Sequence, residues 1–109
     1  MKIKVELKPL SVNRAWQGKR FKTPEYKSFE KYLMLLLPKL DIKKKEKLKV
    51  DFVFGFATKA SDIDNPVKPC LDVMQKKYGI NDNDIFELNI KKEVVGKGNE
   101  FIELRIEQI

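Results

Sequence analysis

"LKVDFVFGFATKASDIDNPVKPCLDVMQKKYG", residues 48–79, contains the two patterns from which the fold of this chain can be predicted. Apolar side chains first alternate with other residues at a period of two, which is typical of a strand with one buried face. They are Leu48, Val50, Phe52, Phe54 and Phe56. Further on, apolar residues recur at helical spacing up to Gly79, which is a natural helix stop. These are Val67, Cys70, Leu71, Met74 and Tyr78.

The segments before this stretch predict a strand, a loop and a helix. Residues 2–8 alternate between apolar and charged side chains, as a half-buried strand does. Residues 9–23 have turn formers, basic residues and aromatics without a period, so we expect a long ordered loop. Thr23, Pro24 and Glu25 are suited to a helix N-terminus, and Pro38 to its end. The expected apolar stripe of this helix consists of Phe29, Leu33, Leu36, Leu37 and Leu40.

The segments after the stretch predict a turn and two strands. Residues 80–84 are turn formers, and Phe86, Leu88 and Ile90 then alternate on one face of a strand. Residues 96–99, "GKGN", predict a hairpin turn before a last alternating strand. The order strand, helix, strand, helix, strand, strand indicates one α+β domain over residues 1–109. It would have a mixed β-sheet of about four strands packed with two main helices.

The composition limits the class of function. The chain has 109 residues, 23 Lys and Arg against 16 Asp and Glu, and a net charge of +7. This charge favours a polyanionic partner, nucleic acid before an anionic membrane, although a lysine-rich surface also serves solubility. The absence of His excludes histidine metal sites and histidine acid–base catalysis. One cysteine, no signal-peptide core and no membrane-length apolar run indicate a cytoplasmic protein without a membrane partner.

Two carboxylates, Asp62 and Asp64, flank Ile63 just after the Phe-rich strand. If this segment is extended, both point the same way, and like charges so close repel each other, which a bound cation would relieve. Carboxylate oxygens suit Mg²⁺ or Mn²⁺. Alternatively, Asp64 or Asn65 is the N-cap of the following helix, with Pro66 in its first turn.

Lys68 and a second acidic turn accompany these carboxylates. Lys68 follows Asp64 by four positions, so it lies on the same helix face and can reach a phosphate near a metal. Its alternative role is an i,i+4 ion pair with Asp72. Asp82 and Asp84 stand among asparagines after the helix, where ordinary turn formation also explains them.

Three segments together resemble the RusA family of Holliday-junction resolvases: "DIDNPVKPCLDVM", the later "NDNDI" and the upstream "KPLSVNRAW". The resemblance implies a small, dimeric, Mg²⁺-dependent endonuclease, often carried by prophages, that acts in DNA recombination and repair. It implies that Asp62, Asp64 and Asp82 are the catalytic, metal-binding acids and that Lys68 is the essential lysine.

We therefore expect paired symmetric nicks in a four-way junction, with Mg²⁺ as cofactor and Mn²⁺ as a substitute. Basic and polar residues of two segments are expected to contact the DNA backbone. They are Asn13, Arg14, Lys19, Arg20, Lys43, Lys44 and Lys45. Trp16 and Phe21 either stack on bases at the crossover or pack into the protein. The alternative function is a branched-DNA-binding protein that does not cut.

The spacing of the acids predicts a shared site in a homodimer. Asp62 and Asp64 precede the second helix, and Asp82 follows it. A straight helix of roughly 14 residues would separate them by about 20 Å. One chain could bring the acids together only if the helix were short or broken, for example at Pro69. Two subunits related by a two-fold axis would overcome the separation otherwise, because Asp82 of one could approach the other acids on its partner.

Overall fold

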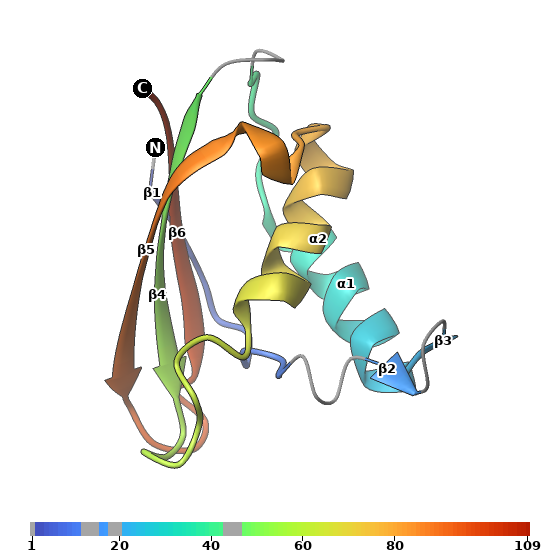
Figure 1. Ribbon diagram of the computed structural model, residues 1–109. Helices are drawn as coiled ribbons and strands as arrows, with labels where there is room; N and C mark the ends of the chain where they lie inside the picture. Colours follow the sequence, from blue (N-terminus) through green and yellow to red (C-terminus); the bar gives the residue numbers. More distant parts are fainter. Residues whose placement is uncertain (1, 12–15, 18–20, 43–46) are drawn as a thin grey trace.

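The structure is a computed structural model, and it describes residues 2–11, 16–17, 21–42 and 47–109. Figure 1 shows the strands and helices of the chain. In order, they are β1 (Lys2–Val5), β2 (Trp16–Gln17), β3 (Phe21–Lys22), α1 (Pro24–Leu36), β4 (Leu48–Phe56), α2 (Val67–Tyr78), the 3₁₀ turn η2 (Asp82–Asp84), β5 (Ile85–Val94) and β6 (Phe101–Gln108).

Four of the strands form a mixed sheet in the order β1-β6-β4-β5. β4 runs parallel to β5 and antiparallel to β6, which in turn is antiparallel to β1. The expected apolar face of β4 is almost completely buried, with exposed fractions of 5% or less. The predicted α+β class and four-stranded mixed sheet are thus confirmed.

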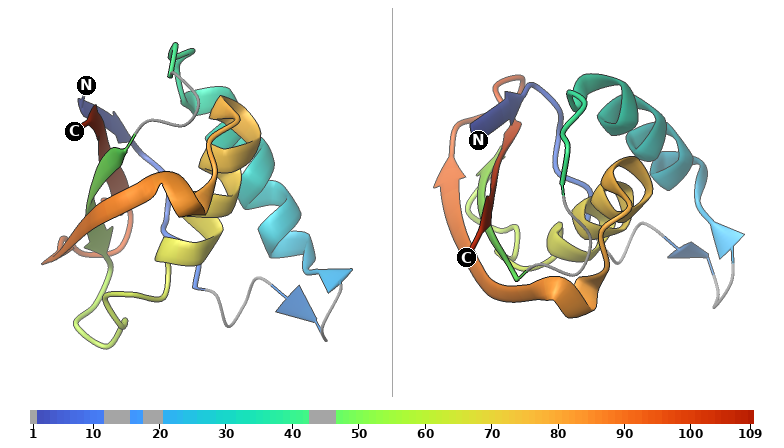
Figure 2. Two further views of the ribbon diagram at one scale, coloured as in Figure 1. Left: turned by 45° about the horizontal axis from the view of Figure 1, so that its top comes forward. Right: turned by 90° about the horizontal axis from the view of Figure 1, so that it is seen from above.

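Both helices pack on one face of this sheet, and α1 lies on the outer side of α2 (Figures 1 and 2). Thr23 caps α1 as predicted, because its Oγ1 accepts a hydrogen bond of 3.1 Å from the backbone N–H of Tyr26. α1 ends at Leu36, shortly before Pro38. α2 ends at Tyr78 and is capped by Gly79, whose left-handed backbone (φ 67°) favours glycine.

The apolar stripe of α1 differs from the predicted one at two positions. Phe29, Leu33 and Leu37 are buried as expected, but Leu36 is 48% exposed and Tyr26 is buried instead. The buried positions are separated by three or four residues, which is the helical repeat, whereas Leu36 adjoins Leu37 and projects from another side of the helix.

β5 also differs in part, because it lies at the sheet edge. Leu88 and Ile90 are paired with Val50 and Phe52, so they share the face towards the helices. Phe86 is the extra residue where the register shifts, and it is 63% exposed. The segment of residues 9–23 was expected to be a loop, yet β2 and β3 pair there as a short antiparallel hairpin.

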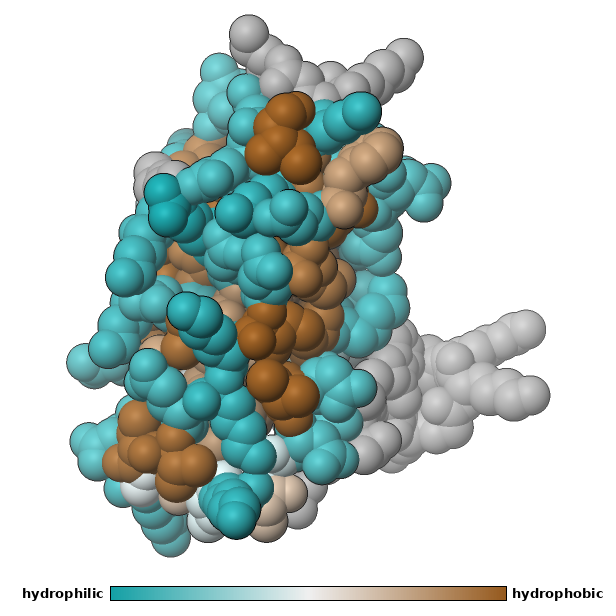
Figure 3. Space-filling view, turned by 60° about the vertical axis from the view of Figure 1, so that its left-hand side comes forward, coloured by the Kyte–Doolittle hydropathy of each residue, from teal (hydrophilic) through white to brown (hydrophobic). Residues whose placement is uncertain are grey.

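The sheet face turned away from the helices carries charged side chains of both signs. Lys2 pairs with Glu103 at 3.4 Å, and Lys49 pairs with Glu87 at 3.2 Å. On the side where β5 lies, Figure 3 shows a mainly hydrophilic surface with scattered hydrophobic areas. No helix in the described part of the chain is long and apolar enough to cross a membrane.

Candidate active site

Asp62 and Asp64 lie in the loop from the C-terminal end of β4 to α2, and both are exposed. This loop is not extended at the acids, as the sequence analysis assumed. The Asp62 carbonyl accepts a hydrogen bond from Asn65 N–H (3.3 Å), and the Asp64 carbonyl accepts one from Val67 N–H (3.1 Å). Two successive turns therefore replace the extended segment, and the rule that residues i and i+2 share a face does not apply.

The alternative role of Asp64 or Asn65 as a helix cap is also wrong. The N-cap of α2 is Pro66, with helical backbone angles (φ −82°, ψ −5°) and no side-chain capping hydrogen bond. Among the residues that the structure describes, neither Asp62 nor Asp64 has a side-chain hydrogen bond or ion pair. The two carboxylates are thus open to a ligand from solvent.

Lys68 projects from the first turn of α2 and contacts two carboxylates. Its Nζ donates to Asp72 Oδ1 at 2.8 Å, which is the i,i+4 pair considered in the sequence analysis. The same Nζ lies 3.6 Å from Asp82 Oδ2. The hydrogen bond to Asp72 raises the pKa of Lys68 against a smaller lowering by burial, and the charges of both carboxylates add to the rise, so the amine is a cation at neutral pH.

Asp82 reaches Lys68 because of the way the chain turns after α2. α2 has 12 residues, and after Gly79 the chain reverses beside the end of the helix before it crosses to β5 (Figure 1). Asn81 begins the turn η2, because its Oδ1 accepts a hydrogen bond from Asn83 N–H at 3.0 Å. The reversal brings Asp82 within reach of a side chain from the first turn of α2, and one chain accomplishes this without a second subunit.

The donor chemistry of Asp62, Asp64 and Asp82 fits a hard divalent cation, since all three are exposed carboxylates. Their arrangement does not yet form a three-acid site. No group of three potential metal-ligating side chains occurs among the described residues. The structure instead brings the third acid to Lys68.

A cavity of about 540 Å³ opens beside Asp62, and Asn65 and Pro66 form part of its wall. Glu25, Ser28, Phe29 and Tyr32 of α1 form the opposite side. The end of β4, residues 7–11 and Glu100 complete the lining. Apart from Asp62, the lining residues carry no sequence signal of a site, because they come from segments that only the fold brings together.

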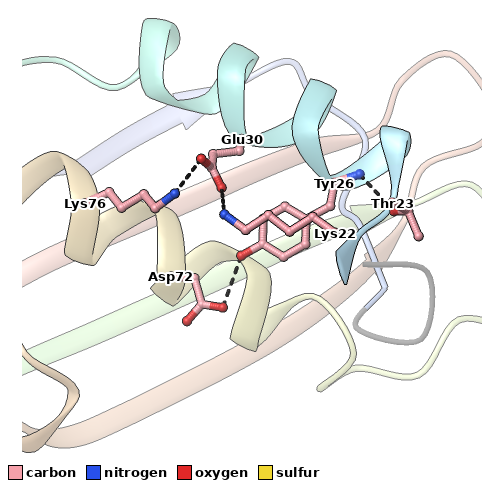
Figure 4. Close-up of polar contacts among 6 residues, drawn as sticks. All are labelled: Lys22, Thr23, Tyr26, Glu30, Asp72 and Lys76. Atoms are coloured by element: carbon pink, nitrogen blue, oxygen red, sulfur yellow. Dashed lines mark hydrogen bonds and ion pairs between the residues drawn. The ribbon is translucent and has the colours of Figure 1, made fainter. Parts of the chain in front are cut away.

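Asp72 and Tyr26 are further residues that sequence reasoning missed as parts of the site. Tyr26 Oη of α1 donates a hydrogen bond to Asp72 Oδ2 at 3.1 Å, across 46 positions of sequence (Figure 4). One helical turn further along both helices, Lys76 Nζ donates to Glu30 Oε1 at 2.7 Å. These two polar contacts thus join α1 and α2 near Lys68.

The expected DNA-contacting residues all lie outside the described residues. They are Asn13, Arg14, Lys19, Arg20, Lys43, Lys44 and Lys45. The structure describes the backbone of Trp16 and Phe21 in the hairpin β2–β3, but it does not test the proposed base stacking.

Residues 7–107 match the sequence family described as endodeoxyribonuclease RusA, which is nearly the whole chain. No curated protein sequence matches it.

Proposed function

The chain belongs to the RusA family of endodeoxyribonucleases, and on that premise we propose that it resolves four-way DNA junctions by paired symmetric nicks. The family match over residues 7–107 is the observation on which this proposal rests. The proposed setting is recombination and repair of phage or prophage DNA in the cytoplasm. The proposed cofactor is Mg²⁺, with Mn²⁺ as a substitute.

The residues that would hold the metal are Asp62, Asp64 and Asp82. All three have carboxylates that are accessible from solvent, and the first two follow each other in the β4–α2 loop. A bound divalent ion supplies an activated water and neutralises charge on the phosphate that is cut. The reaction is hydrolysis of one phosphodiester bond in each of two opposed strands.

Lys68 has a separate role in this proposal. Its ammonium group lies 3.6 Å from Asp82, so it stands beside one of the proposed metal-binding acids. A fixed cation there stabilises negative charge that develops on the phosphate in the transition state, or it orients the nucleophile. The cavity next to Asp62 supplies room for the part of the DNA strand that flanks the cut.

A homodimer is proposed because a four-way junction has approximate two-fold symmetry and must be cut twice. The outer side of α1 supports this assembly, because it exposes three large apolar residues that lie within about one helical turn of each other. Their exposed fractions are 56% for Tyr32, 73% for Leu35 and 48% for Leu36. Burial of such a patch against a second copy is favourable.

The experiment incubates the protein with a four-way junction, with and without Mg²⁺, at two salt concentrations. Paired nicks that require the metal support the nuclease. Salt-sensitive retention of the junction without cutting in Mg²⁺ or Mn²⁺ supports the alternative, a binding protein that does not cut. Absence of salt-sensitive retention contradicts both functions.

A further inference from the structure

The carboxylate of Asp72 is held by two donors of different kinds. Oδ1 accepts from Lys68 Nζ on the same helix at 2.8 Å, and Oδ2 accepts from Tyr26 Oη on α1 at 3.1 Å. Tyr26 is 1% exposed, so packing fixes its ring and hydroxyl. Burial, followed by the charge and hydrogen bond of Asp72, raises the pKa of Tyr26, so the hydroxyl remains a neutral donor.

This geometry differs from an ordinary surface ion pair. An exposed i,i+4 pair on a helix stabilises by only about 0.3–0.5 kcal/mol and leaves a long lysine side chain free to change rotamer. Here the side chain of Asp72 is 21% exposed, and its second oxygen is bound to a buried group of another helix. The Asp72 carboxylate is thus held at both oxygens, and one of them contacts the Lys68 amine.

A second contact joins α1 and α2 one helical turn away. Glu30 lies four residues after Tyr26, and Lys76 lies four residues after Asp72, so the two contacts repeat at one helical turn (Figure 4). Glu30 Oε2 also accepts from Lys22 Nζ of β3 at 2.7 Å. These contacts of Glu30 link the same two helices without touching Lys68 or Asp72.

We propose that Asp72 is a positioning residue that holds the Lys68 ammonium beside Asp82, and that Tyr26 fixes Asp72 in the orientation required. This inference rests on the proposed function through the role of Lys68. A purely structural role, in which the contacts only join the helices, is the competing explanation. Glu30 provides the matched control, because it joins the same helices one turn away without touching Lys68.

The first test uses the metal-free protein and does not depend on cutting. Side-chain order at the Cε of Lys68 is measured by ¹³C relaxation, with the exposed Lys27 of α1 as internal reference. We expect lower order at Lys68 in Asp72→Asn and in Tyr26→Phe, and no change in Glu30→Gln. Unchanged order at Lys68 in Asp72→Asn overturns the proposal. Tyr26→Phe keeps the ring, so it remains a test if Asp72→Asn does not fold.

The second test is a double-mutant cycle on cleavage of saturating junction. We expect Asp72→Asn alone to lower kcat about tenfold without a change in junction Kd. In the Lys68→Ala background the same substitution should cost nothing further, because Asp72 acts only through Lys68. If the fold-losses of kcat caused by the two single substitutions multiply in the double variant, Asp72 acts independently of Lys68 and the proposal is overturned. If the wild-type protein does not cut junctions, the proposed function fails, while the relaxation experiment still reports whether Asp72 holds Lys68.

Discussion

Asp64 occupies a hydrogen-bonded turn, and its carboxylate has no role in capping α2. We therefore predict that Asp64→Asn abolishes cutting, because a proposed metal ligand is lost, and leaves the fold intact. Junction binding should stay equal or become stronger, because a negative charge near the phosphate is removed. Cleavage and gel-shift assays check both expectations. A variant that cuts at nearly the wild-type rate would show that Asp64 is not a ligand.

Lys68 is distinguished from the other lysines by its position between two carboxylates. We predict that Lys68→Ala lowers the cleavage rate far more than junction affinity, because its effect is on the reacting phosphate. Joint neutralisation of Lys43, Lys44 and Lys45 should do the opposite. It should weaken binding and reduce the salt dependence of affinity, with cutting at saturation largely preserved.

The measurements that separate these roles are kcat and junction Kd over a range of salt concentrations. If Lys68→Ala and the triple variant lose affinity alike and keep the same kcat, Lys68 is an ordinary phosphate contact.

At the scale of elements, Glu30 joins β3, α1 and α2, since its two oxygens accept from Lys22 and from Lys76 at 2.7 Å each. Burial raises the pKa of Glu30, but these hydrogen bonds and the two positive charges outweigh it, so the pKa is lowered. A lowered carboxyl pKa stabilises the fold above the unfolded-state pKa, and this stabilisation disappears as the pH falls through the folded-state pKa.

We therefore predict that Glu30→Gln lowers the free energy of unfolding at pH 7 by roughly 1 kcal/mol, a value at the upper end for partly exposed ion pairs. Below the folded-state pKa, wild type and variant should differ little. Urea unfolding at both pH values measures this difference. Equal destabilisation at both pH values would show that the charge of Glu30 contributes nothing.

At the scale of the whole molecule, the question is whether each active site of the proposed dimer is formed by one subunit or by two. Asp82 contacts Lys68 of its own chain, so we predict that each site is built within one subunit of the proposed dimer. A mixture of Asp64→Asn and Asp82→Asn subunits, each inactive alone, should then remain inactive, because every site has one mutation.

Subunit exchange must be demonstrated first, for example with subunits that carry two different fluorescent labels. Recovery of single-strand nicking in the exchanged mixture would instead establish a shared site, since one site per heterodimer would then have no mutation.

Much of the fold was predictable because its signals are local. The period-two pattern of β4 and the cap at Thr23 each depend on a few neighbouring residues, and the structure confirms them. The stop at Gly79 is equally local, since φ of 67° suits glycine. The predicted burial was wrong at Leu36, which adjoins Leu37, because the helical period alone does not decide which of two neighbouring apolar residues faces the core.

The residue types of the candidate site, with Asp62, Asp64, Lys68 and Asp82 among them, were also readable from the chain. Their arrangement was not, because it depends on where the chain turns and how the helices pack. The reversal after Gly79 brings Asp82 to Lys68, a contact that helix length alone does not predict. Packing of α1 on α2 joined Tyr26 to Asp72 across 46 positions. Contacts between segments so distant leave no period or motif in the sequence, so only the tertiary structure could reveal them.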